Sequence, residues 1–185
     1  MPGWCSHPKT SYPPRDYESH DKEGPMPFAM ECVVACALFT LAIKLASTGR
    51  REAFENDYPP VVTQRLREQG LLATRPPSRR GDVIRKVVAF VVFSVLFALV
   101  LRHTNGIRTF EQAALTSYAI WFVVDWYDFL VVDIALAPLD PFYRAAGVSA
   151  LDPSAVRFHF LASLRGLATG IPFALVVGAL VTLLP

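Results

Sequence analysis

The chain has 185 residues, of which 52% are hydrophobic, and carries a formal net charge of +2 at pH 7. A soluble domain is usually about 45–50% apolar, so the excess favours a membrane protein. The small net charge gives no argument for a nucleic-acid partner. The apolar residues lie in four blocks with the charged residues between them, which predicts an all-α fold, a four-helix transmembrane bundle.

Residues 1–27 precede the first apolar block and are polar, rich in proline and mixed in charge. This composition predicts a disordered N-terminal tail, and no cleavable signal peptide is evident in it. Residues 28–185 are predicted to form one transmembrane domain. Cys32 and Cys36 lie four residues apart in the first block, and we interpret both as small core residues.

The predicted spans are residues 28–47, 83–101, 113–136 and 158–184. Loop 48–82 is rich in arginine, and a short amphipathic helix is expected within it around residues 61–72. That helix could lie on the lipid headgroups or in solvent.

Lysine and arginine are more frequent in loop 48–82 and in the loop after the third span than on the opposite side. The positive-inside rule therefore predicts that loop 48–82 is cytoplasmic and that both termini are outside, with the chain in the inner or plasma membrane.

Three aspartates lie in the third span: Asp125, Asp128 and Asp133. Ionised carboxylates in hydrocarbon cost several kcal/mol each, so they persist only when paired, hydrated or functional. At about 100° per residue, these aspartates and Tyr118 share one side of a helix. We therefore expect this side to face the interior of the bundle.

Depth along the helices suggests partners for the aspartates. With a rise of about 1.5 Å per residue, Arg165 of the fourth span lies level with Asp128, and His159 lies level with Asp133. Lys44 of the first span reaches the same depth. The prediction is a buried polar network made of Asp125, Asp128, Asp133, Arg165, His159, Lys44 and Tyr118.

Three interpretations of this network stay open. Its ion pairs could only fix the register of the helices, or the aspartates could bind a cation or carry a proton. The third is an enzyme acting on a lipid headgroup, because the D-x-x-D spacing of Asp125 and Asp128 is typical of some magnesium sites. No catalytic residue, and no cofactor other than this cation at Asp125, Asp128 and Asp133, is predicted.

The fourth span carries a second pattern, a small residue at every fourth position. Such a stripe lets two helix backbones approach closely, either within the chain or between it and a second copy or another membrane protein. The stripe consists of Ala162, Gly166, Gly170, Ala174 and Gly178.

The segments TFEQAALTSYAIWFVVDWYDFLVVD (residues 109–133) and RFHFLASLRG (residues 157–166) resemble a class of small, uncharacterised bacterial four-span membrane proteins. The shared features are an aspartate-rich third span and a Phe-His-Phe start to the fourth. The resemblance implies a helix bundle and no particular activity. We interpret the chain as a non-enzymatic accessory or assembly component of the membrane.

Overall fold

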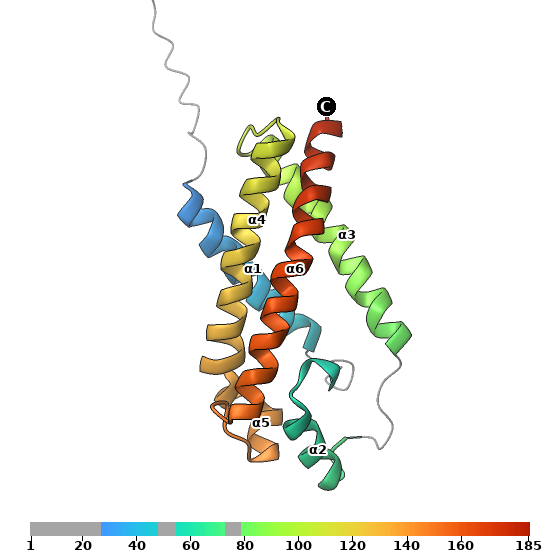
Figure 1. Cartoon of the computed structure of the whole chain (residues 1–185), viewed down its shortest axis with the longest axis vertical. Coiled ribbons are helices and arrows are strands. Elements are labelled where there is room, and N and C mark those ends of the chain that lie inside the picture. The colour runs from blue at the N-terminus through green and yellow to red at the C-terminus, as the bar shows by residue number, and fades with distance from the viewer. Residues whose placement is uncertain (1–26, 48–54, 73–78) are drawn as a thin grey trace, which may run out of the picture.

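The computed structural model describes residues 27–47, 55–72 and 79–185, and these residues form helices without any strand (Figure 1). The all-α prediction is therefore confirmed for this part of the chain. Residues 1–26 of the predicted disordered tail, and residues 48–54 and 73–78 of the arginine-rich loop, lie outside the described residues.

Three helices are long and apolar enough to cross a membrane: α1 (Phe28–Ser47), α3 (Arg79–His103) and α6 (Pro153–Leu183). They correspond to the first, second and fourth predicted spans. The shortest of them, α1, has 20 residues. That number is about what an α-helix needs to cross the hydrocarbon core of a bilayer.

The aspartate-rich segment forms two helices joined end to end. These are α4 (Phe110–Tyr127) and the π-helix η2 (Asp128–Ala135). The first helix begins before the predicted span because the Thr109 side chain caps it, accepting a hydrogen bond from the Gln112 amide at 3.4 Å. This pair is not among the three candidate spans, so its crossing of the membrane stays a prediction.

The short elements gather at one end of the bundle, which we call the α2–α5 end (Figure 1). There α2 (Pro60–Glu68) packs against η3 (Ala137–Leu139) and α5 (Pro141–Ala146). The amphipathic helix expected in the loop is α2. Its buried residues Val62 and Leu66 give it an apolar face that packs on the bundle.

The centre of the protein is the antiparallel pair α4 and α6, against which α1 and α3 pack from different sides (Figure 1). Phe173 of α6 is almost fully buried, and its ring lies 4.7 Å from Trp121, 5.3 Å from Phe97 and 5.8 Å from Phe90, between ring centroids. These edge-on and tilted contacts join α3, α4 and α6 into one core.

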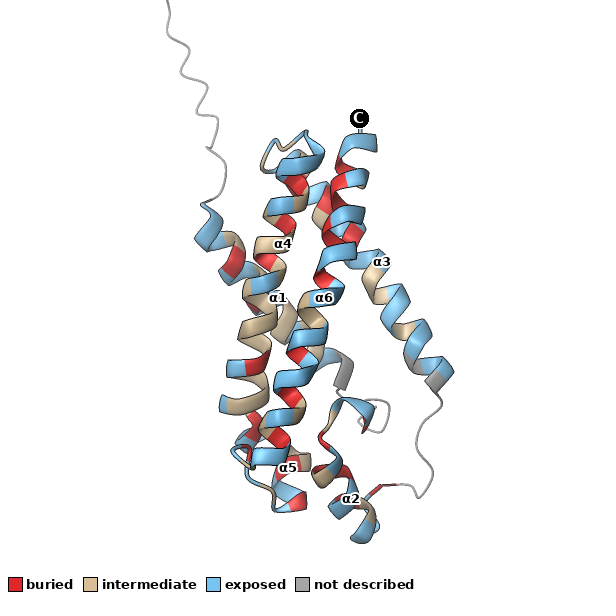
Figure 2. Cartoon of the chain, viewed as in Figure 1, coloured by how far each residue is buried: buried red, intermediate tan, exposed pale blue. Residues whose placement is uncertain are grey.

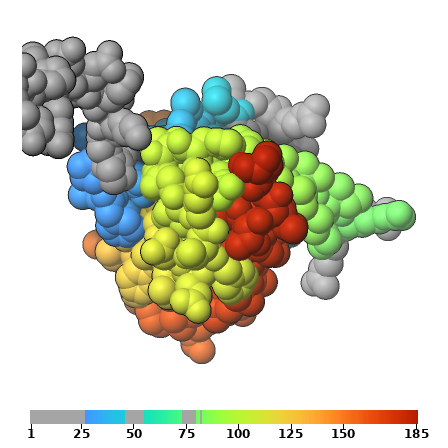
Figure 3. Space-filling view, turned by 90° about the horizontal axis from the view of Figure 1, so that it is seen from above, coloured from blue at the N-terminus to red at the C-terminus, as the bar shows by residue number. Residues whose placement is uncertain are grey.

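Two of the long helices are poorly covered by the rest of the protein. Only 11% of the apolar window of α1, and 11% of that of α3, is buried (Figure 2). In the view from above, α3 projects away from the other helices (Figure 3). Apolar surface of this extent suggests a lipid bilayer environment for these helices.

The small-residue stripe of α6 faces α4 along much of its length. A Cβ atom added at Gly170 would lie 2.5 Å from the Trp121 ring, and one at Gly178 would lie 3.0 Å from the Phe110 ring and carbonyl oxygen. The glycines therefore let large α4 side chains lie directly on the α6 backbone. Of the other stripe positions, Gly166 lies against Asp125, Ala174 is buried, and Ala162 is exposed.

The start of α6 is capped by Asp152, whose Oδ1 accepts hydrogen bonds from the Ser154 amide at 2.9 Å and the Ser154 hydroxyl at 2.5 Å. These bonds favour the charged carboxylate and hold the pKa of Asp152 below its usual range. The cap satisfies donors that the first turn of a helix leaves without a partner.

We expect Gly170→Ala to lower the free energy of unfolding by about 1–3 kcal/mol, because the new methyl group collides with Trp121. Thermal unfolding in detergent measures the loss. Gly81→Ala is the matched control, since a Cβ atom there has nothing within 4 Å and alanine is the better helix former. An equal loss in both variants would contradict the close packing of α4 on α6.

We expect Asp152→Asn to remove a pH dependence of stability. Asparagine keeps a capping oxygen but does not titrate. Because the folded-state pKa of Asp152 is lowered, its contribution is present above the unfolded value of about 3.9 and is lost as pH falls through the folded value. The gap between the melting temperatures of the two proteins should therefore narrow below pH ~4. Parallel curves would contradict this role.

Candidate functional site

A chain of three polar side chains crosses the α2–α5 end of the protein. Oδ2 of Asp133 lies 2.8 Å from Nδ1 of His159, and Nε2 of the same ring lies 2.7 Å from the Tyr143 hydroxyl. His159 and Tyr143 are each only 4% exposed, whereas the Asp133 side chain is 27% exposed. The chain therefore runs from a partly open carboxylate to a buried phenol.

Each of the three residues comes from a different element, so the contact depends on how those elements pack. Asp133 belongs to η2, Tyr143 to α5 and His159 to the second turn of α6. The Tyr143 ring also stacks on the imidazole, with 6.4 Å between centroids. The Asp133–His159–Tyr143 chain thus joins three separate segments of the fold at one point.

The hydrogen-bonding pattern is satisfied by one tautomer of the imidazole. Nδ1–H donates to the Asp133 carboxylate, and Nε2 accepts from the Tyr143 hydroxyl. Burial, together with the nearby Asp133 and Asp140 carboxylates, raises the pKa of Tyr143 above its ordinary value. The phenol therefore keeps its proton and remains a donor.

The π-helix affects where the aspartates point. In an α-helix, residues five apart differ by about 140° around the axis, so Asp128 and Asp133 would face different ways. Hydrogen bonding in a π-helix joins residues five apart. The bond from the Leu136 amide to the Val131 carbonyl, 2.8 Å long, has this spacing. This winding brings Asp128 and Asp133 closer to a common face.

Asp125 lies further along the α4–α6 contact, away from the α2–α5 end. Its Oδ2 accepts a hydrogen bond from the Ser163 hydroxyl, and its Oδ1 lies against Gly166. One turn away, Nε1 of Trp121 donates to the Gly166 carbonyl at 3.0 Å. Trp121 and Asp125 of α4 are therefore bonded to α6.

No hydrogen bond or ion pair of the described residues joins Asp128, Arg165 or Tyr118 to this network. Arg165 is exposed on α6, and no ion pair joins it to the half-buried Asp128. The reason is helical geometry: Ser163 faces α4, and Arg165 is two residues on, about 200° around the axis. Lys44 is exposed in the last turn of α1, and Tyr118 is half-buried in α4.

Sequence reasoning did not find Ser163 or Tyr143 as network members. Ser163 could have been found, because it lies four residues after His159 and three before Gly166, on the face of α6 that packs on α4. No sequence signal links Tyr143 to His159, since the contact depends on how α5 folds back against α6.

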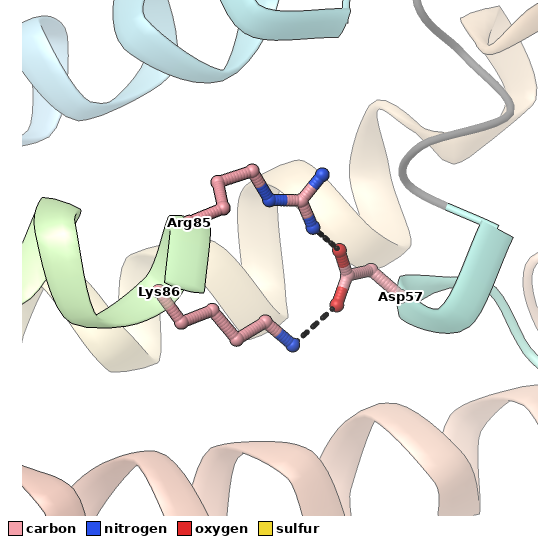
Figure 4. Close-up of polar contacts among 3 residues, drawn as sticks. All are labelled: Asp57, Arg85 and Lys86. Carbon is pink, nitrogen blue, oxygen red and sulfur yellow. Dashed lines mark hydrogen bonds and ion pairs between the residues drawn. The ribbon is translucent and has the colours of Figure 1, made fainter. Parts of the chain in front are cut away.

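A second polar cluster joins the loop region to the start of α3 (Figure 4). The Arg85 guanidinium lies 3.3 Å from one carboxylate oxygen of Asp57, and Nζ of Lys86 lies 3.0 Å from the other. The side chains of Asp57 and Lys86 are exposed, and that of Arg85 is partly exposed. Each contact is therefore worth at most about 1 kcal/mol. The cluster ties α3 to the residues that precede α2.

No group of three or more His, Cys, Asp or Glu side chains able to hold a metal ion occurs within residues 27–47, 55–72 and 79–185. Asp125 is bonded to Ser163 while Asp133 is bonded to His159, so these two carboxylates have separate partners. A cation at Asp125, Asp128 and Asp133 stays a prediction.

Comparisons with protein-family models, with curated proteins and with solved structures found no match, so no family is identified for this chain. The geometry of the site is accordingly the basis for any functional argument.

We expect Tyr143→Phe to lower the free energy of unfolding by about 1–3 kcal/mol, because it leaves the buried Nε2 of His159 without its partner. Tyr118→Phe is the matched control: no described residue forms a hydrogen bond with that hydroxyl, so its loss should change stability little. Chemical or thermal unfolding of both variants in one detergent measures the difference. Equal effects would count against the Tyr143–His159 bond.

Proposed function

We propose that this chain is a non-enzymatic accessory or assembly component of the membrane, a scaffold whose polar groups fix the packing of its own helices. The observation that carries the proposal is the Asp133–His159–Tyr143 chain, in which each polar group is bonded to another side chain of the protein. These bonds hold η2, α5 and α6 together. They also use the hydrogen-bonding groups that a ligand would otherwise contact.

The exposed apolar faces of α1 and α3 support an accessory role. A stable, isolated bundle would bury more of each helix against its neighbours, and here α1 contacts mainly α4 while α3 contacts mainly α6. The hydrogen bond between Thr40 and Tyr127, 2.9 Å long, is a polar link from α1 to α4. Faces this open suit lipid and the membrane helices of a partner protein.

The proposal includes four spans, with α4 and η2 as the third crossing. Together they form a continuous helical segment, and Asp125 within it is bonded to Ser163 of α6 and faces away from lipid. The described bases Arg65, Arg67, Arg85 and Arg144 lie in or near α2, α5 and the start of α3. This distribution supports a cytoplasmic α2–α5 end, with both termini outside.

A second candidate function is the binding of a proton or a cation by the aspartates. It is favoured by the π-helix, because such helices occur frequently at functional sites and this one carries both Asp128 and Asp133. The partly exposed Asp133 would be the point at which a proton or an ion reaches His159.

Thermal melts in sodium, magnesium, calcium and zinc separate the two candidates. For a scaffold, the wild-type melting temperature is the same in all four salts, and Asp133→Asn lowers it equally in each, because His159 loses a charged partner. Glu111→Gln, at an exposed carboxylate of α4, is the control and should have little effect.

The opposite result is a melting temperature that rises in one salt for the wild type but not for Asp133→Asn. A ligand stabilises the state that binds it, so this outcome would replace the scaffold by a cation-binding protein. A rise that persists in Asp133→Asn would place the ion elsewhere and leave the Asp133–His159–Tyr143 chain with a structural role.

A further inference from the structure

An open groove lies between α2 and the first turns of α6, on the outside of the α2–α5 end. Its volume is about 430 Å³, and its lining is largely apolar, with Val61 on one side and Phe158 and Leu161 on the other. The polar groups of the lining include the Gln64 amide and the Arg157 guanidinium. Among the described residues that line it, Arg157 carries the only charge.

The groove lies where α6 enters its apolar segment. Arg157 is in the second turn of a helix that could cross the membrane from Pro153 onward, whereas Leu161 is one turn deeper. If α6 crosses the bilayer, the polar end of the groove lies at headgroup level and its apolar end at the level of the first acyl carbons.

Arg165 extends the same side of α6. It follows Leu161 by four residues, so the two lie on one face about 6 Å apart along the axis. Side chains in a helix lean toward its N-terminus, which directs Arg165 back toward the groove. An exposed arginine within a membrane span is costly unless it reaches an anion or the interface, and no described carboxylate forms an ion pair with this one.

Two carboxylates near the groove could repel an anion. One is Glu68, whose Oε1 accepts a hydrogen bond from Nε2 of Gln64 at 3.0 Å. The other is Asp152. Its oxygen already accepts two hydrogen bonds from Ser154, and Arg65 of α2 is close enough to favour its charged form. Arg65, Arg157 and Arg165 outnumber Asp152 and Glu68 beside the groove, so the balance of charge there favours a negatively charged group.

We propose that this groove binds one anionic phospholipid, with its phosphate at Arg157, toward which the Arg165 side chain leans, and one acyl chain along Leu161. The guanidinium groups form charge-assisted hydrogen bonds to phosphate oxygens. The apolar lining between the two arginines separates this site from one for a free phosphate ion. The inference rests on the proposed membrane crossing of α6.

Native mass spectrometry of the full-length protein in detergent tests the site. The probes are phosphatidylglycerol and phosphatidylcholine with identical acyl chains, and the readout is the ratio of their dissociation constants for the first bound lipid. The wild type should bind phosphatidylglycerol more tightly. Arg157→Gln and Arg165→Gln should each weaken it about fivefold, corresponding to ~1 kcal/mol per basic residue near a membrane surface.

Phosphatidylcholine should lose less affinity in both variants, because its choline group cancels the charge of the phosphate, and the melting temperature without added lipid should be unchanged. Arg144→Gln removes an exposed arginine of α5 at the same end of the protein and should leave the ratio unchanged. Leu161→Ser should weaken both lipids, because it removes apolar contact with the acyl chain.

Three results would overturn the proposal. Equal affinity of the wild type for the two lipids would show that the site does not prefer an anionic headgroup. A loss in Arg144→Gln as large as in Arg157→Gln would reduce the effect to general surface charge. Displacement of phosphatidylglycerol by inorganic phosphate would make the site one for a free anion. The thermal melts in different salts test the proposed scaffold role independently of this lipid site. Lipid selectivity is measured on folded protein at one salt composition, so either proposal can fail without the other.

Discussion

The close approach of α4 and α6 is the contact on which the rest of the structure depends. Small residues at every fourth position of α6, among them Gly166 and Gly170, remove the side chains that would otherwise separate the two helices, so Trp121 and Asp125 lie directly against its backbone. In a bilayer, lipid tails are as apolar as leucine, so helices associate through packing and hydrogen bonds. The glycine stripe supplies the packing and also brings the polar groups of both helices within bonding distance.

That approach also gives partners to one acidic residue of α4 and one of η2. Asp125 is bonded to Ser163, and Asp133 is bonded to His159, so two carboxylates that would be costly in hydrocarbon each have a partner on α6. The partners are a hydroxyl and an imidazole, so the interior contains few full charges. An arrangement of this kind gives hydrogen bonding at a lower desolvation cost than paired ions would.

The two ends of the bundle differ in how they are held. At the α2–α5 end, short helices fold back against α6 and form a second apolar cluster around Val62, Leu66 and Tyr143. At the opposite end, α3, α4 and α6 meet around Phe173 and Val177. Between these clusters α3 leaves the bundle, so its apolar surface is available to lipid or to a partner. A scaffold role and a lipid site are both compatible with this division, because they use different faces of α6.

The sequence by itself determined the helices. In lipid an apolar block of membrane-spanning length must satisfy its own backbone hydrogen bonds, which an α-helix does, and α1, α3 and α6 form where those blocks lie. It also determined that acidic residues needed partners. Which partners they found was decided by tertiary structure: depth along an axis suggested Arg165, but rotation about that axis places Arg165 outside and Ser163 inside. The π-helix and the fold of α5, which bring Asp133 and Tyr143 to His159, arise from packing between segments distant in sequence, and local residue patterns do not encode such contacts.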